Sequence, residues 1–317
     1  MSESKILSQA REFGFDLAGV CRAEIPEQDR KNIIEWTEKG LYGEMDWYPK
    51  NMNLRLKFEN LGFTPKSVIV LGVLYNTAET ERIISQNNYK ISRYAAGKDY
   101  HKVIKTMGKP LMNFLASAFP ENHFRMGTDS LPVSEKVLAK EAGLGWIGRN
   151  TNLINSEKGS YFFLSEILTD LELSPDSPVK DRCGKCRACL DACPTGALFE
   201  EYKINAEKCI SYLTIESERM DQPLEFKNKR KGWIYGCDIC QEVCPWNHAV
   251  AVKKNSYSTR PEFIPSNRLL FMNRDEIESL NEESFQDAQS GTSMERISFR
   301  MIQRNIREAQ ESEQEEV

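Results

Sequence analysis

The stretch CGKCRACLDACPTGAL, residues 183–198, places four cysteines within eleven residues and follows the last one with a proline. Cysteines this close together indicate a disulfide framework, a structural zinc site or an iron–sulfur cluster. The chain of 317 residues contains no apolar run near the roughly 18 residues that a transmembrane helix needs. Its first residues show no hydrophobic signal region, so we expect a cytoplasmic protein with no membrane partner. Thiols stay reduced in that compartment, which disfavours disulfides.

The cysteine spacing favours iron–sulfur clusters over a structural zinc site. Eight of the nine cysteines lie between residues 183 and 244. The first four follow C-x2-C-x2-C-x3-C-P, and CDICQEVCPW (237–246) repeats the second half of that pattern. A zinc site takes four ligands, usually as two CxxC pairs, and does not require the third cysteine or the proline. The run is typical of two-cluster ferredoxins, so eight ligands predict two 4Fe–4S clusters.

The same ferredoxin pattern assigns the ligands, because the fourth cysteine of each run serves the other cluster. We expect one cluster to be held by Cys183, Cys186, Cys189 and Cys244. The second is then held by Cys193, Cys209, Cys237 and Cys240. The ninth cysteine, Cys21, stands alone in an apolar run and is interpreted as a small buried hydrophobic residue.

The N-terminal residues read as a mixed α/β (α+β) domain. Helical periodicity predicts four helices, and β-branched and apolar runs predict two buried strands. The helices cover residues 2–14, 28–40, 99–119 and 134–143, with Ser2 and Ser134 as N-caps, and the strands cover residues 67–75 and 161–168. No GxGxxG follows a strand and no GxxxxGK[ST] occurs, so neither a dinucleotide nor ATP has a local motif.

Four segments resemble the epoxyqueuosine reductases, which are iron–sulfur and cobalamin enzymes of queuosine synthesis. They are SRYAAGKDYHK (92–102), DSLPVSEKVLAKEAGLGWIGRNTNLIN (129–155), GSYFFLSEIL (159–168) and the cysteine block, and the resemblance covers about residues 5–310. It implies reduction of epoxyqueuosine to queuosine at the wobble base of tRNA. It also implies an N-terminal cobalamin domain like that of reductive dehalogenases.

The resemblance also implies roles for single residues. The proton donor of the family's D-S-x-P-V motif falls on Asp129, and Pro132 predicts that this residue lies on a loop. A positioned acid suits the reaction, because loss of the epoxide oxygen as water consumes two electrons and two protons. The residues expected to contact cobalamin are Arg55, Arg93, Asp129, Asn150 and Leu153.

The tRNA partner requires a local basic patch, because the formal net charge is −5. One candidate patch is KNKRK (227–231), with Lys229, Arg230 and Lys231, and Lys136 is a further candidate. Four arginines also recur near the C-terminus, at Arg296, Arg300, Arg304 and Arg307. Solvated faces and ion pairs, for example to Glu295 or Glu308, are the alternative interpretation of these charges.

We therefore expect three parts: a cobalamin-binding α/β catalytic domain at 1–176, a ferredoxin-type two-cluster domain at 177–250, and a helical C-terminal segment of truncated repeats with an acidic tail at 251–317. The partners expected are tRNA and an electron donor, with the chain itself a monomer. Two other functions stay open. A corrinoid reductive dehalogenase would use the same parts on a small molecule. A ferredoxin-type electron carrier would leave the N-terminal residues and the Asp129 loop without a role.

Overall fold

The computed structural model describes residues 3–87, 89–252 and 257–314; at residues 249–252 and 312–314 it describes the backbone alone. The chain forms two compact units, described here separately. Unit 1 comprises residues 1–74 and 101–186, and unit 2 comprises residues 75–100 and 187–317. The expected N-cap Ser2 and the end of the acidic tail lie outside the described residues.

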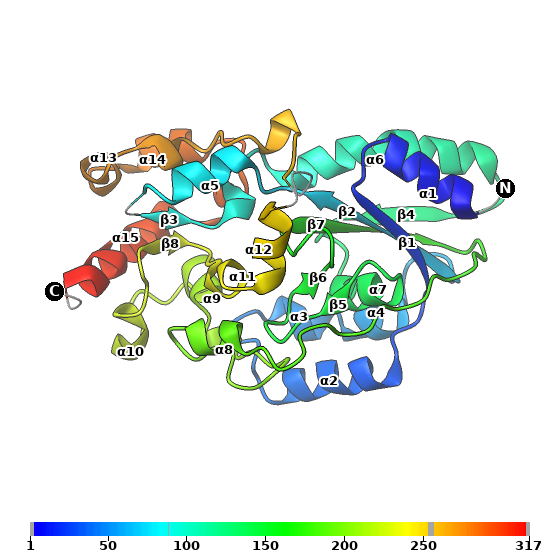
Figure 1. Ribbon diagram of the computed structural model, residues 1–317, viewed down its shortest axis with the longest axis horizontal. Helices are drawn as coiled ribbons and strands as arrows, with labels where there is room; N and C mark the ends of the chain where they lie inside the picture. Colours follow the sequence, from blue (N-terminus) through cyan, green and yellow to red (C-terminus); the bar gives the residue numbers. More distant parts are fainter. Residues whose placement is uncertain (1–2, 88, 253–256, 315–317) are drawn as a thin grey trace. The chain divides into compact units, whose positions relative to one another are not determined.

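Unit 1 contains the mixed α/β architecture expected of the N-terminal residues (Figure 1). Its helices are α1 (Glu3–Glu12), α2 (Glu27–Glu38), α3 (Trp47–Lys50), α4 (Met52–Lys57), α6 (Tyr100–Ala118) and α7 (Glu135–Glu141). Its strands are β1 (Leu17–Arg22), β2 (Ser67–Leu74), β4 (Phe124–Gly127), β5 (Trp146–Ile147), β6 (Leu153–Ile154) and β7 (Phe162–Thr169). The two strands and four helices expected from the sequence are present, with ends shifted by a few residues. Ser134 precedes α7 but makes no side-chain capping bond.

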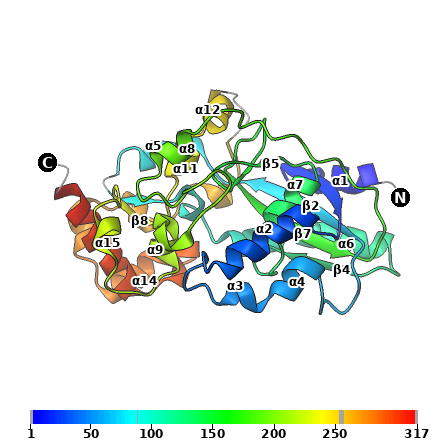
Figure 2. The same ribbon diagram turned by 90° about the horizontal axis from the view of Figure 1, so that it is seen from below.

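The main sheet of unit 1 has the strand order β1-β2-β7-β4, and every neighbouring pair is antiparallel. Helices α1 and α6 cover one face, while α2, α4 and α7 cover the other (Figure 1). Seen from below, the helices of that second face lie in front of the sheet (Figure 2). All of β2 is buried, because successive side chains alternate between two covered faces. Cys21 is buried on β1, which confirms its interpretation as a core residue.

Unit 2 is mostly helical and has its own hydrophobic core. Its helices are α5 (Ala78–Ile84), α8 (Ala188–Ala192), α9 (Ile210–Ile215), α10 (Leu224–Lys227), α11 (Ile239–Glu242), α12 (Pro245–Val252), α13 (Arg274–Glu278), α14 (Glu282–Gln289) and α15 (Phe299–Gln314). A two-stranded parallel sheet joins β3 (Lys90–Ile91) to β8 (Trp233–Tyr235). Because β8 lies between Cys209 and Cys237, this pairing joins residues 75–100 to the segment that contains the cysteines.

The boundaries of the two units coincide only in part with those of the three domains expected at 1–176, 177–250 and 251–317. Residues 75–100 precede the expected boundary at 176 yet belong to unit 2, and the cysteine block is divided after Cys186. Residues 257–314 form helices and turns within unit 2. Over the described part of the chain, every helix is too short or too polar to span a membrane.

Candidate active site and cluster-binding segment

Asp129 lies in unit 1 on the loop that follows β4, as its position before Pro132 predicts. Its φ of 55° is in the left-handed region, which Asp adopts more readily than most residues. The side chain is 53% exposed, and its Oδ2 lies 3.4 Å from Nε2 of His101 on α6. The carboxyl therefore faces outward and is accessible to a substrate.

The loop is anchored on its N-terminal side by hydroxyl groups. Thr128 is buried, and its hydroxyl donates to Oγ of Ser165 at 3.0 Å. Ser165 in turn donates to the carbonyl of Gly127 at 2.7 Å. These bonds fix the end of β4 against β7, one residue before Asp129.

Two further carboxyl groups lie behind Asp129, and sequence reasoning did not identify either. Oε1 of Glu135, the first residue of α7, accepts the backbone N–H of Asp129 at 2.8 Å. Glu166 on β7 is 0% exposed, and among the described residues no N–H or hydroxyl group donates to its oxygens. The group within hydrogen-bonding reach of Glu166 is the carboxyl of Glu135. A glutamate inside the apolar strand FFLSEILT was the sequence signal for this pair.

The two glutamates differ from ordinary surface acids. Burial raises the pKa of Glu135 to about 7, and the nearby charge of Asp129 adds to the rise. Burial also raises the pKa of Glu166 well above its ordinary value, and Glu135 contributes to that shift. Burial and the neighbouring carboxyl groups thus favour the neutral form of both glutamates over the charged form.

This pair predicts that the stability of the fold falls as the pH rises. Acids whose pKa is raised on folding contribute stability that is present below about pH 4.5 and lost as the pH rises, for Glu135 through about pH 7. Glu166→Gln removes one such acid and retains an N–H donor for Glu135. We expect its gain in unfolding free energy over the wild type to grow from about zero at pH 4.5 to on the order of 1–3 kcal/mol at pH 8.

Denaturant titrations at several pH values measure that difference. Glu38→Gln, at the exposed end of α2, controls for the loss of a negative charge. A constant difference between Glu166→Gln and wild type across the pH range would contradict the raised pKa of Glu166.

Arg55 lies on α4 within the same unit and is 5% exposed. Its guanidinium stacks on Tyr48 at 3.9 Å, and Nη1 donates to the carbonyl of Val133 at 3.2 Å. Nε and Nη2 are buried and have no protein acceptor. Burial lowers the pKa of Arg55, while Tyr48 and the charges of Glu135 and Asp129 oppose that shift. Two buried donors in an acidic site could therefore serve a ligand.

The segment GLGWIGRNTNLI (143–154) forms a tight hairpin of β5 and β6. We find that its glycines are needed by the chain itself, because a Cβ at Gly145 would lie 2.3 Å from the carbonyl oxygen of Ile154. Asn150 is buried in the turn, and its Oδ1 accepts the backbone N–H of Asn152 at 3.2 Å. Leu153 packs in the core of unit 1. Its side chain is thus unavailable to a ligand, which leaves only its backbone.

The hairpin also holds the first cysteines, a role that sequence reasoning missed. The guanidinium of Arg149 donates to the carbonyl oxygens of Cys186 at 2.9 Å and Gly184 at 2.6 Å. Burial raises the pKa of the Cys183 thiol, and the neighbouring side chain of Trp146 and backbone of Arg149 oppose the rise. Groups that lower the pKa of a thiol favour the thiolate, the form that ligates iron.

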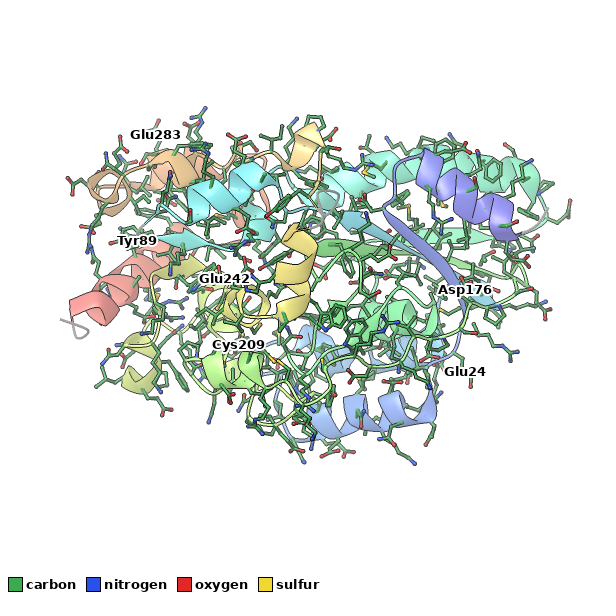
Figure 3. All side chains as sticks on the ribbon, viewed as in Figure 1. Glu24, Tyr89, Asp176, Cys209, Glu242 and Glu283 are labelled. Carbon is green, nitrogen blue, oxygen red and sulfur yellow. The ribbon has the colours of Figure 1, made fainter. Side chains whose placement is uncertain are left out.

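In unit 2 the structure brings together four cysteines that are far apart in sequence. Burial, and then the charge of Cys209, raises the pKa of the Cys237 thiol well above its ordinary value. Burial also raises the pKa of Cys240, with Cys209 and Cys193 among the further causes. Figure 3 shows the side chains of this unit and labels Cys209. The ferredoxin pattern assigned these four to the second cluster, but Cys189, which it assigned to the first, acts on Cys240 as well, so these contacts do not separate the two ligand sets.

Cys189 is a further charge that acts on Cys240, and Cys244 is buried at the start of α12. Among the described residues, no three His, Cys, Asp or Glu side chains are placed to hold a single metal ion. The assignment of the eight cysteines therefore depends on their spacing.

Arg93, expected beside cobalamin, lies in unit 2 and is 7% exposed. It forms ion pairs with Glu81 at 2.7 Å, with Asp238 at 3.1 Å and with Glu242 at 2.7 Å. Asp238 lies between Cys237 and Cys240, and Glu242, labelled in Figure 3, lies between Cys240 and Cys244. The guanidinium of Arg93, which follows β3, thus joins this segment and α5 to the last cysteine run.

The expected tRNA-binding residues differ in their exposure. Lys229 and Lys231 are exposed, but Arg230 is 0% exposed and pairs with the buried Glu308 of α15. The expectation for Arg230 is therefore wrong, because a guanidinium enclosed in the core cannot reach a phosphate. Lys136 is exposed at the surface of unit 1, where it donates to the carbonyl of Thr151 at 3.0 Å.

The C-terminal arginines are divided in the same way. Arg304 is buried and donates to the carbonyls of Leu213, Ser217 and Arg219. Arg296 is exposed and pairs with Glu216 at 2.9 Å, a partner that the sequence did not predict. Arg300 and Arg307 are exposed as well, so of these four arginines Arg304 alone serves the packing of α15.

Comparisons with known proteins agree on one family. The model described as "4Fe-4S double cluster binding domain" matches residues 182–247, and "Epoxyqueuosine reductase QueG, DUF1730" matches residues 55–130. An epoxyqueuosine reductase of Leadbetterella byssophila is 42% identical over 304 residues, which are 95% of this chain and 96% of that protein.

Solved structures agree with these matches. A crystal structure of epoxyqueuosine reductase with an epoxyqueuosine-modified tRNA-Tyr stem loop has a TM-score of 0.84 and 27% identity. The match covers 98% of this chain and 81% of that one. A Bacillus subtilis epoxyqueuosine reductase with its catalytic aspartate loop swung out of the active site gives the same scores and coverage.

Proposed function

This chain belongs to the epoxyqueuosine reductase family, and we propose that it reduces epoxyqueuosine to queuosine at the wobble position of tRNA. The observation that carries the proposal is the Asp129 loop, an accessible carboxyl in front of a buried acidic pair, in a chain that also contains the eight-cysteine block. The chain is an oxidoreductase. We further propose that it acts in the cytoplasm as a monomer, and that the ranges 1–176, 177–250 and 251–317 divide its functions.

The reaction fixes what the residues must do. An epoxide becomes an alkene when two electrons enter and the oxygen leaves as water, which takes up two protons. An oxygen that leaves without a proton is a poor leaving group, so an acid must stand beside it. Asp129 is the group we assign to that role, because its carboxyl is accessible and its backbone is fixed from both sides.

Cobalamin is the cofactor that the family resemblance implies. The residues of unit 1 fit a bound polar cofactor in one respect: Arg55 has two buried nitrogens, Nε and Nη2, whose N–H groups have no acceptor among the described residues. Arg55, the backbone at Leu153 and the turn at Asn150 are the groups we propose to hold it, with Asp129 on the reacting side. When bound, the corrinoid supplies low-potential electrons to the substrate. Arg93 is a weaker candidate, because three carboxylates already engage its guanidinium.

The eight cysteines are proposed to hold two 4Fe–4S clusters that receive electrons from an external donor. The 4Fe–4S family match covers all eight, and in unit 2 the charges of Cys189, Cys193 and Cys209 act on Cys240 while those of Cys209 and Cys240 act on Cys237. We keep the crossed assignment, in which Cys244 completes the first cluster and Cys193 the second. The direct test is anaerobic reconstitution with iron, sulfide and cobalamin, followed by turnover of tRNA that carries epoxyqueuosine. About eight irons and about one cobalt per chain are expected. A reconstituted chain that leaves this tRNA unchanged would overturn the function.

The tRNA surface is proposed to include Lys229, Lys231 and Lys136. Lys229→Gln combined with Lys231→Gln should weaken tRNA binding and lower the slope of log affinity against log salt by about one unit for each lost phosphate contact. Binding measured at several salt concentrations checks this. Lys203→Gln, which breaks an ion pair with Glu200 in the same unit, is the matched control. An unchanged slope in the double variant would move the tRNA surface elsewhere.

A further inference from the structure

The backbone of Asp129 requires support from its surroundings. A left-handed φ is unfavourable for a residue other than glycine, so an isolated loop would leave this conformation readily. On the side of β4, the loop is held by the hydroxyls of Thr128 and Ser165. On its other side, the backbone contact that we find at Asp129 is the bond from its N–H to Oε1 of Glu135.

Glu135 is itself held in place by the fold. It begins α7, which packs on β1, β2 and β7 of the main sheet. Glu166 is enclosed in the middle of β7, and Glu135 is the neighbouring carboxyl that contributes most to its raised pKa after burial. The carboxyl of Glu135 is therefore placed by the helix start, between the sheet and the N–H of Asp129.

We propose that Glu135 is a positioning residue that holds the Asp129 loop in the conformation that presents the acid to the substrate. This inference rests on the proposed role of Asp129 as proton donor. Glu135 contacts the loop backbone and need not contact the substrate, so it acts through Asp129.

The first test uses the chain without cofactor and measures amide hydrogen exchange. Glu135→Ala removes the acceptor, so exchange at residues 128–131 should become about tenfold faster or more, as expected for the loss of one such bond. Glu135→Gln keeps an oxygen at the same place and should restore most of the protection. Glu141→Ala, at the other end of α7, is the matched control and should leave the loop unchanged.

The second test measures steady-state turnover of the loaded enzyme on epoxyqueuosine tRNA. In Glu135→Ala, kcat should fall by about tenfold or more while KM for tRNA stays within about twofold, because only the placement of the acid has changed. Glu135→Gln should recover most of kcat. A merely structural role would not give this split or this rescue.

Each outcome bears on the proposal. Unchanged exchange in Glu135→Ala, or equal losses in the Ala and Gln variants, would overturn it. Faster exchange in Glu135→Ala, together with normal turnover in Asp129→Asn, would leave the positioning contact intact and show that the proposed role of Asp129 has failed. The exchange measurement therefore separates the two proposals.

Discussion

Asp129→Asn should lower turnover of epoxyqueuosine tRNA by about 10²–10⁴-fold, the usual contribution of a general acid. The structure makes this substitution a clean test. Asn tolerates a left-handed φ as well as Asp does, and the bond that reaches Glu135 comes from the backbone N–H, which the variant keeps. The change therefore removes the acid while the loop stays in place.

Single-turnover reduction under excess reductant measures the effect. The cluster and cobalt spectra of the variant should match the wild type, because Asp129 contacts no cysteine in the structure described here and its side chain lies at the surface of unit 1. Near-normal turnover with unaltered spectra would assign the proton to another group, and His101, 3.4 Å from the carboxyl, would be the next residue to replace.

Cys244→Ser should abolish the cluster assigned to Cys183, Cys186 and Cys189, and with it the flow of electrons to the substrate. The reason is the crossed ligand pattern, in which the last cysteine of one run completes the cluster of the other. A serine hydroxyl replaces a thiolate poorly as an iron ligand, so about half of the iron should be lost on reconstitution.

Electron paramagnetic resonance of the reduced protein distinguishes the two clusters. The signal of the cluster assigned to Cys237 and Cys240 should persist in Cys244→Ser. Cys21→Ala, which removes a buried cysteine outside the block, should keep both signals. Loss of the Cys237 signal in place of the other would show that each run serves its own cluster.

The local patterns of the sequence were sufficient for much of unit 1. A run of β-branched residues such as SVIVLGVL is buried on both faces wherever it pairs, so β2 followed from composition alone. The long amphipathic pattern of α6 and the loop position of Asp129 followed in the same way. What such patterns do not contain is the partner of each strand, and the antiparallel order β1-β2-β7-β4 came only from the structure.

Charged residues show the limit most clearly. In sequence, Arg230 and Lys231 look alike, yet the structure encloses one with Glu308 and exposes the other. Likewise the sequence does not show that Arg93 pairs with Glu81 on α5 and with two carboxylates of the last cysteine run, Asp238 and Glu242. The position of a charged residue in the sequence does not show whether other elements of the fold bury its side chain.

The sequence by itself determined the chemistry, because cysteine spacing and the D-S-x-P-V motif act through residues a few positions apart, whose separation the backbone fixes. Tertiary structure decided the environment of that chemistry. Glu135 and Glu166 are 31 positions apart, and only the packing of α7 on β7 brings their carboxyls together and removes them from water. Removal from water is what shifts the pKa of an acid, and it depends on every element that covers the group.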